Sequence, residues 1–209
     1  PPALRQDLIA RARISRIEPG RWIYGMGDAL NGLYGVVEGS VHLLSSTAGT
    51  QSVLLEIVQA GQWFGQAGRF GGGPRLVTAI AGEKTILAFL PDHAMHAIGA
   101  KAPEIWRNFT ELLYGQLAGA LLLATLALSL PPAKRVAARL ALLAGAQKSG
   151  PVRLSVTQSQ LAEMTGLSRK TVNFHAQALE RMGLLSLSYG ALTVTDPARL
   201  LAKAGISLP

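Results

Sequence analysis

The side chains best suited to contact a charged partner lie in the last third of the chain. Residues 131–209 hold ten Lys and Arg residues against three Asp and Glu residues, a net charge of +7, whereas residues 1–130 hold ten against nine. A small basic domain is the footprint expected for a polyanion, because each neutralised phosphate releases a bound counterion. A surface that only keeps the protein soluble is the alternative interpretation.

Little in the chain suits catalysis or metal binding. It contains no cysteine, which excludes a disulfide framework, a thiolate zinc site and a cysteine-bound iron–sulfur cluster. His93 and His96 could share a helix face, but Asp92 is the only acid nearby, so we interpret them as ordinary surface histidines. No Ser/His/Asp group or carboxylate pair is recognisable, and we expect neither an enzyme nor a metal site.

Within the basic segment, residues 157–181 have the features of two short helices joined by a tight turn. These features are a capping box, a small residue where the helices cross, a glycine for positive φ and an N-cap serine. In order, the residues are Thr157 with Gln160, Ala162, Gly166 and Ser168. Two β-favouring runs then flank Tyr189-Gly190. The pattern predicts a winged helix-turn-helix, and an ordinary helical hairpin is the alternative.

Upstream, short β-favouring runs separated by glycines extend from Ile14 to about Leu90 and predict an antiparallel sandwich or barrel. A long helix should follow between Pro103 and Pro131, since proline suits a helix start but not a helix interior. Apolar or small residues recur along it in alternating steps of four and three, which predicts a dimer seam. The predicted seam consists of Ile105, Phe109, Leu112, Gln116, Gly119, Leu123, Leu126 and Leu130.

The uncharged stretch 112–130 also has nearly the length of a membrane span. Polar residues and glycines dilute it, Pro131-Pro132 closes it, and no aromatic belt marks its C-terminal end. We therefore expect a dimerisation helix and no membrane, with a membrane-tethered regulator as an alternative. The chain starts with Pro1-Pro2 instead of Met, so we expect unseen residues upstream, and no export signal is visible.

Taken together, these features resemble the cyclic-AMP receptor protein / fumarate-nitrate regulator (CRP/FNR) family of bacterial transcription factors. The resemblance covers nearly the whole chain and rests on residues 33–41, 61–66 and 167–172. It implies an α+β fold: an N-terminal antiparallel β-roll (a jelly-roll-like cyclic-nucleotide-binding fold), a long dimerisation helix and a C-terminal winged helix-turn-helix. The expected domains are 1–103, 104–130 and 131–209. It also implies a cytoplasmic homodimer on double-stranded DNA, with RNA polymerase as a candidate partner.

The resemblance places DNA-contacting residues on the second helix of the motif. Arg169 would reach the base edge of a guanine, whose two acceptors match a guanidinium fork. Phe174 stands where the family commonly has a second arginine, and it offers at most an apolar contact to a thymine methyl. The expected DNA-binding residues are Thr157, Ser159, Ser168, Arg169, Lys170, Thr171, Asn173 and Phe174.

For an effector, nucleotide-binding members use a Gly-Glu pair on the ribose, an arginine and a small hydroxyl residue on the phosphate, and Thr or Ser on the base. Here the matching positions lack the acid and the hydroxyls, so we expect no cyclic AMP and predict no cofactor. The candidate effector residues are Gly65, Gln66, Arg75, Leu76, Ala120 and Leu121. A different effector, a partner protein or no effector remain open. The rival function is a ligand-binding signalling module whose basic C-terminal domain docks to protein.

Overall fold

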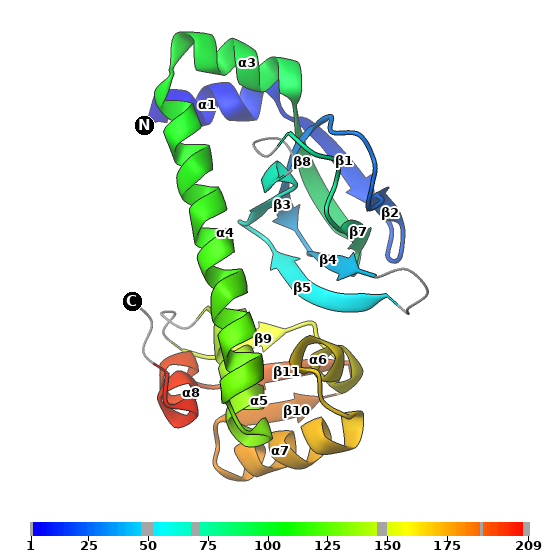
Figure 1. Cartoon of the computed structure of the whole chain (residues 1–209), viewed down its shortest axis with the longest axis vertical. Coiled ribbons are helices and arrows are strands. Elements are labelled where there is room, and N and C mark those ends of the chain that lie inside the picture. Colours follow the sequence, from blue (N-terminus) through cyan, green and yellow to red (C-terminus); the bar gives the residue numbers. More distant parts are fainter. Residues whose placement is uncertain (1, 47–51, 68–71, 146–149, 189, 207–209) are drawn as a thin grey trace. The chain divides into compact units, whose positions relative to one another are not determined.

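The computed structural model describes residues 2–46, 52–67, 72–145, 150–188 and 190–206. The chain divides into two compact units, Pro1–Ala118 and Gly119–Pro209 (Figure 1). The division falls inside the helix α4, Glu104–Ser129. Our three-part division at residues 103 and 130 is a finer one and stays a prediction.

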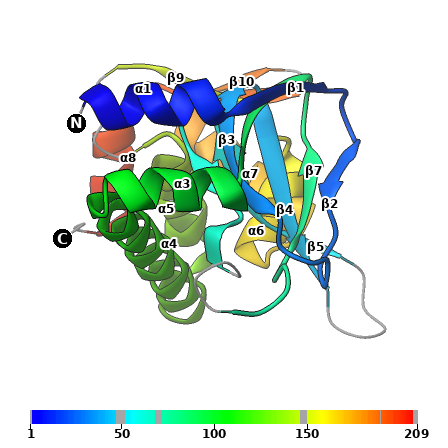
Figure 2. The same ribbon diagram turned by 90° about the horizontal axis from the view of Figure 1, so that it is seen from above.

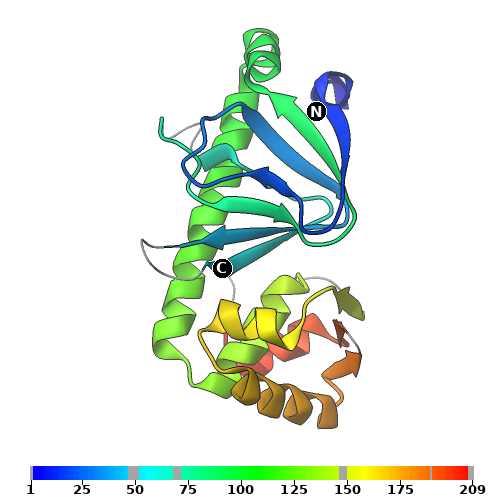
Figure 3. The same ribbon diagram turned by 90° about the vertical axis from the view of Figure 1, so that its right-hand side faces the viewer.

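Unit 1 is built on two four-stranded antiparallel sheets, which Figure 3 shows facing each other. The first has the order β1-β8-β3-β6 and the second the order β2-β7-β4-β5. The strands of the first sheet are β1 (Arg13–Ile17), β8 (Thr85–Pro91), β3 (Gly32–Glu38) and β6 (Trp63–Phe64). Those of the second are β2 (Trp22–Tyr24), β7 (Thr78–Ala81), β4 (Ser40–Ser45) and β5 (Val53–Gln59). The predicted β-roll is confirmed.

One hydrophobic core lies between these sheets, because successive side chains of a strand point to opposite faces of its sheet. Both sheets contribute to it, with Tyr34 and Phe64 from the first and Tyr24 and Val41 from the second. The rings of Tyr34 and Phe64 stack with centroids 5.3 Å apart. The turn between β3 and β4 needs Gly39, whose φ is +82° and whose Cβ would lie 2.6 Å from the Lys84 carbonyl oxygen.

A second core of unit 1 joins the end of the first sheet to helices. Leu33 and Leu90 pack there with α3 (Asp92–Lys101) and the first turns of α4. Gly99 allows the close approach of α3 to α4, since a Cβ at that position would lie 2.5 Å from the Trp106 ring. Figure 2 shows α1 (Pro2–Arg11) beside α3. We did not predict α1.

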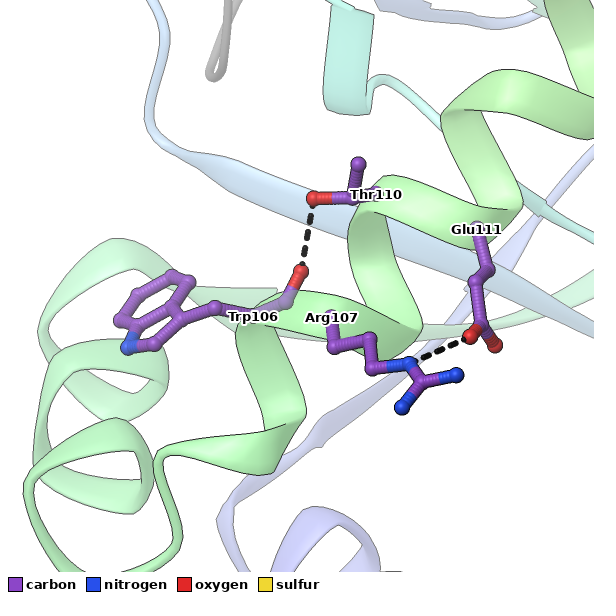
Figure 4. A network of polar contacts seen from close by, with 4 residues as sticks. All are labelled: Trp106, Arg107, Thr110 and Glu111. Atoms are coloured by element: carbon purple, nitrogen blue, oxygen red, sulfur yellow. Dashed lines mark hydrogen bonds and ion pairs between the residues drawn. The ribbon is translucent and has the colours of Figure 1, made fainter.

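The helix α4 begins and ends where the two prolines predict. Its charged residues are confined to the first two turns, where Arg107 Nε donates to Glu111 Oε1 at 2.9 Å and Thr110 Oγ1 donates to the Trp106 carbonyl at 2.9 Å (Figure 4). It is the one described helix long and apolar enough to cross a membrane, and only 6% of its apolar window is buried. An exposed apolar helix surface of this kind is typical of a site that a partner covers.

Unit 2 packs four further helices with a three-stranded antiparallel sheet of order β10-β11-β9 (Figure 1). The helices are α5 (Pro132–Leu143), α6 (Gln158–Thr165), α7 (Arg169–Arg181) and α8 (Pro197–Ala204), and the strands are β9 (Val152–Leu154), β10 (Leu185–Ser188) and β11 (Ala191–Val194). Buried alanines and leucines of α5 form the centre, in contact with α6, α7 and α8. The predicted winged helix-turn-helix is confirmed, with Tyr189 of the wing outside the described residues.

Candidate nucleic-acid interface

The first helix of the motif is held by the capping box that the sequence predicts. Thr157 Oγ1 accepts from the Gln160 backbone N–H at 3.2 Å, and Gln160 Oε1 accepts from the Thr157 N–H at 2.8 Å. At the other end Gly166 adopts φ 63° and ψ 33°, and its N–H reaches back to the carbonyls of Ala162 and Glu163. Both ends of α6 are therefore fixed by local hydrogen bonds.

The second helix, α7, starts at a second cap and locks one face into the core. Ser168 Oγ accepts from the Thr171 N–H at 3.1 Å. Val172, Ala176 and Leu179 follow at the spacing i, i+4, i+7 and are at most 4% exposed. Because this face is fixed, the opposite face of α7 points outward in a defined orientation.

That outward face carries the residues expected to contact DNA. Arg169 and Lys170 are exposed, and Phe174 is 64% exposed with its ring edge against His175. Two cations in the first turn lie at the positive end of the helix dipole, where they weaken an isolated helix. A phenylalanine as exposed as Phe174 gains little from folding. These three side chains make sense as contacts to an anionic partner with apolar groups.

The other candidates serve partly in holding the motif together. Ser168 and Thr171 bond to each other through their hydroxyls at 2.8 Å in addition to the cap. Asn173 Oδ1 lies 3.5 Å from Gln158 Nε2, which links α7 to α6. Thr157 and Ser159 are exposed at the start of α6. The structure thus brings together all eight candidates, and Thr157, Ser168, Thr171 and Asn173 each use the side chain in a hydrogen bond within the motif.

The wing is anchored on α7. Glu180 Oε1 accepts from the Leu187 N–H at 2.8 Å, and Thr195 Oγ1 donates to the Gly183 carbonyl at 2.7 Å. Gly190 has φ +71° in the hairpin turn. No local pattern points to Glu180, because its partner Leu187 follows only after the helix has ended. The wing therefore keeps a fixed position beside the outward face of α7.

In unit 1, the candidate effector residues do not form one open site. Gln66 is fully buried, and within the described chain neither end of its amide has a hydrogen-bond partner. Leu76 points outward with 63% of its surface exposed. Ala120 and Leu121 are exposed residues of α4 that belong to the second unit. Only Gly65 and Arg75 are joined by a direct contact.

Arg75 is enclosed by the β-roll itself. It is 3% exposed and donates to the carbonyls of Gly65 at 2.6 Å and Gly32 at 2.9 Å, and to Asn31 Oδ1 at 2.8 Å. Its guanidinium carbon lies 4.3 Å from the centre of the Tyr24 ring, a cation–π contact. Burial raises the pKa of the Tyr24 hydroxyl to about 12, although the Arg75 charge opposes that shift. We call this arrangement the Arg75 cage.

The cage residues Asn31 and Tyr24 were missing from our sequence-based candidates. Asn31 lies 44 residues before Arg75, and no local pattern links the two. Arg75 can approach residue 65 this closely because that residue is glycine: a Cβ at Gly65 would lie 2.5 Å from Arg75 Nη1. The family resemblance implies Gly65 as an effector-binding residue, whereas in the structure its carbonyl accepts from Arg75.

The first two residues of the predicted dimer seam are covered within unit 1, and the seam as a whole stays a prediction. Ile105 and Phe109 are 1% and 7% exposed and belong to the second core of unit 1. Gln116 Nε2 donates to the Trp63 carbonyl at 3.0 Å. Of the others, Leu126 is 6% exposed, and Leu112, Gly119, Leu123 and Leu130 are half-buried. Steps of four and three identify an apolar face without saying what covers it.

The two histidines considered for metal binding are exposed on α3, and His96 packs against Trp106 with ring centroids 5.7 Å apart. Among the described residues, no group of three His, Cys, Asp or Glu side chains could hold a metal ion.

Comparisons with known proteins agree with both units. Residues 14–101 match a cyclic nucleotide-binding domain, and residues 134–203 match a Crp-like helix-turn-helix domain. The cyclic AMP receptor protein of Thermus thermophilus is 31% identical over 181 residues, covering 87% of this chain and 83% of that protein. A CRP-like cAMP-activated global transcriptional regulator of Mycobacterium tuberculosis is 27% identical over 88% of this chain and 85% of its own length.

Among solved structures, FixK2 from Bradyrhizobium japonicum superposes with a TM-score of 0.82 at 19% identity, covering 95% of this chain and 99% of that one. At that identity the match supports the fold alone. The helix-turn-helix geometry, the β-roll and the relative from Thermus thermophilus lead to one conclusion: this chain belongs to the CRP/FNR family of helix-turn-helix transcription regulators.

Proposed function

We propose that the chain is a homodimeric, sequence-specific DNA-binding transcription regulator. One observation carries the proposal: α7 has a fully buried face at Val172, Ala176 and Leu179, and an opposite face that exposes Arg169, Lys170 and Phe174. This face belongs to the segment with a net charge of +7. A rigid helix with cations on its free side fits the major groove, which admits one α-helix.

The chemistry of that face divides affinity from specificity. Lysines and arginines of unit 2 neutralise phosphates on any sequence, whereas base edges are read by the few side chains that reach the groove floor. Arg169 can donate two parallel hydrogen bonds to guanine. Phe174 can contact a thymine methyl group and has no donor for a guanine at the next position.

We infer the dimer surface from a second apolar stripe on α4. Tyr114, Leu117, Leu121 and Leu128 are 72%, 56%, 61% and 90% exposed, and the small Ala124 lies between the last two. Their steps of three and four form a heptad seam along one continuous helix. A second copy of the chain is the occupant we propose, because a two-fold axis places the same stripe against itself. The two recognition helices would then lie about 34 Å apart, one helical turn of DNA.

The Arg75 cage supports a regulator that does not use cyclic AMP. Three uncharged oxygens and an aromatic face already occupy the guanidinium. A nucleotide phosphate would have to replace contacts that fix β3, β6 and the Asn31 loop. The two curated relatives named above carry cyclic AMP in their names, so a direct titration decides the matter.

Selection of DNA fragments by the purified protein tests the function. We expect a two-fold-symmetric site, with affinity that falls steeply as salt rises. Replacing Arg169 by Ala should weaken binding to that site by about 1–3 kcal/mol and relax the sequence preference at one position. The matched control is Arg199→Ala, an exposed arginine on α8 whose loss removes the same charge. If both variants lose the same affinity on all sequences, Arg169 does not read a base.

Binding of a basic protein-docking module would instead change little with salt, and that outcome would replace the DNA proposal.

The dimer is tested by Leu121→Glu, which introduces a charge into the exposed stripe. We expect monomers in analytical ultracentrifugation at micromolar concentration, because buried like charges would face each other across the axis. The control is Leu76→Glu, since Leu76 is 63% exposed, close to the 61% of Leu121, and is not part of the proposed stripe. A Leu121→Glu dimer as stable as the wild type would rule out this seam.

A further inference from the structure

Two helix ends of unit 2 meet at one side chain. The carbonyls of Leu130, just after α4, and of Thr165, the last residue of α6, lie where a helix leaves its carbonyl oxygens without intrahelical partners. Arg135, in the first turn of α5, donates to both. Its Nη1 lies 3.1 Å from the Thr165 oxygen and its Nη2 lies 3.1 Å from the Leu130 oxygen.

A guanidinium is suited to this double contact. Its donors project from one rigid plane, so two acceptors bound at once have a defined separation and direction. Its charge is also favoured at helix C-termini, where the aligned peptide dipoles leave partial negative charge. The connection between α4 and α5 adds stiffness, because Pro131 has φ −65° and the ring of Pro132 fixes φ in the first turn of α5.

The contact reaches the motif at the point that sets the direction of α7. Thr165 directly precedes Gly166, the left-handed residue of the turn, and Ser168 caps α7 two residues later. One turn further along α5, Arg139 Nη2 lies 3.2 Å from Met164 Sδ. Two arginines on one face of α5 therefore touch the same end of α6.

Stability alone does not explain Arg135. Val136, Ala137 and Leu140 are at most 1% exposed and provide the packing of α5. The Nε atom of Arg135 is buried, and among the described residues it has no hydrogen-bond partner. A side chain selected only to stabilise α5 would avoid that loss.

We propose that Arg135 is a positioning residue: it ties the end of the α4 helix to the turn of the helix-turn-helix and so sets the spacing between the two recognition helices of a dimer. This inference rests on the proposed function, since it concerns how that DNA-reading surface is held. Without the tie, α7 keeps its fold and its exposed side chains, but its direction relative to the end of α4 is no longer fixed.

The experiment uses the full chain and a DNA library with two copies of the selected half-site separated by spacers of varied length. The wild type should prefer one spacer by about tenfold over a spacer one base pair longer or shorter, because one recognition helix then loses its base contacts. Arg135→Met should reduce that preference to about threefold or less, while binding to a single half-site stays within about twofold of the wild type. Lys134→Met removes the same charge from the neighbouring exposed residue and should keep the wild-type preference.

A second readout measures geometry without DNA selection. The chain has no cysteine, so Gln177→Cys, on the exposed side of α7, gives one spin label per protomer. The distribution of distances between the two labels of a dimer should broaden in Arg135→Met and not in Lys134→Met. If Arg135→Met does not fold, Arg135→Lys is measured in its place, since an ammonium lacks the fork that fixes two acceptors.

A folded Arg135 variant with the wild-type spacer preference and an equally narrow distance distribution overturns the proposal. Failure of the proposed function is a different result, because the wild type itself would then select no DNA and show no salt-dependent binding.

Discussion

Replacing Arg75 by Met tests the Arg75 cage most directly. Methionine keeps an unbranched apolar stem and removes the guanidinium that donates to Gly65, Gly32 and Asn31. Each buried acceptor left without a donor costs about 1–3 kcal/mol. Loss of the contact over the Tyr24 ring costs up to about 2 kcal/mol more when the cation is desolvated.

An opposing effect reduces this sum. Arg75 is 3% exposed, so the native state carries the cost of removing a cation from water, which is several kcal/mol per buried ion. The variant no longer carries that cost. All three acceptors are uncharged, so removing the guanidinium leaves no buried charge without a partner. We expect unit 1 to lose about 3 kcal/mol of unfolding free energy, because the lost hydrogen bonds and the lost cation–π contact outweigh the relieved desolvation.

Urea unfolding followed by tryptophan fluorescence measures this loss in unit 1 alone, because Trp22, Trp63 and Trp106 all lie there. With an m-value of roughly 2 kcal/mol/M, the midpoint should fall by about 1.5 M. Leu76→Ala, at an exposed neighbour, should change stability by less than about 0.5 kcal/mol. A midpoint for Arg75→Met within about 0.3 M of the wild type would contradict the cage.

The same assay addresses the effector. A ligand that binds the native state alone raises stability by RT ln(1 + [L]/Kd). If Arg75 is engaged as described, millimolar cyclic AMP should leave the wild-type midpoint unchanged. A midpoint that rises with cyclic AMP in the wild type and not in Arg75→Met would show that the guanidinium is free to bind phosphate.

Three further predictions concern single residues. Burial raises the pKa of Tyr24 to about 12, so the stability linked to its protonated hydroxyl is complete below pH 10. Between pH 10 and 12 the free energy of unfolding should fall by up to about 1.4 kcal/mol per pH unit. Urea unfolding at pH 9 to 11 should show this slope, and Tyr24→Phe should lack it. Ser168→Ala removes the cap on the Thr171 N–H and should cost about 1 kcal/mol, measured as a lower unfolding temperature of unit 2 by circular dichroism. Gly99→Ala would place a Cβ 2.5 Å from the Trp106 ring, so Trp106 must move; we expect a loss of about 1–3 kcal/mol and a shifted tryptophan emission, and an unchanged spectrum would show that α3 and α4 are not in this contact.

The helix-turn-helix could be predicted because its signals are local. Thr157 and Gln160, or Ser168 and Thr171, are three residues apart, and each pair closes its own hydrogen bond. The turn conformation of Gly166 depends on that residue alone. Residue type and short spacing therefore carry the whole argument, and the charge of the segment indicates the class of partner.

The Arg75 cage could not be predicted, because its members come from four separate segments of unit 1. Gly65 lies 10 residues before Arg75, and Gly32 and Asn31 lie 43 and 44 residues before it. Short β-favouring runs reveal that strands exist, but not that β3 and β6 are neighbours. An arginine aligned with a family phosphate ligand looks the same in the sequence whether it faces a pocket or fills it.

The helix α4 shows where periodicity stops being informative. Both the inward set of Ile105 and Phe109 and the outward set of Tyr114, Leu121 and Leu128 are apolar, and both follow steps of three and four. In a helix that is apolar on two faces, either face fits the pattern of a dimer seam, so the sequence does not show which face binds a second copy. The rest of unit 1 decides between the two faces: the second core already covers Ile105 and Phe109, which leaves the exposed set for the second copy that we propose. The proposed dimerisation and the β-roll packing thus use different faces of one helix, and a substitution on one face should leave the other contact intact.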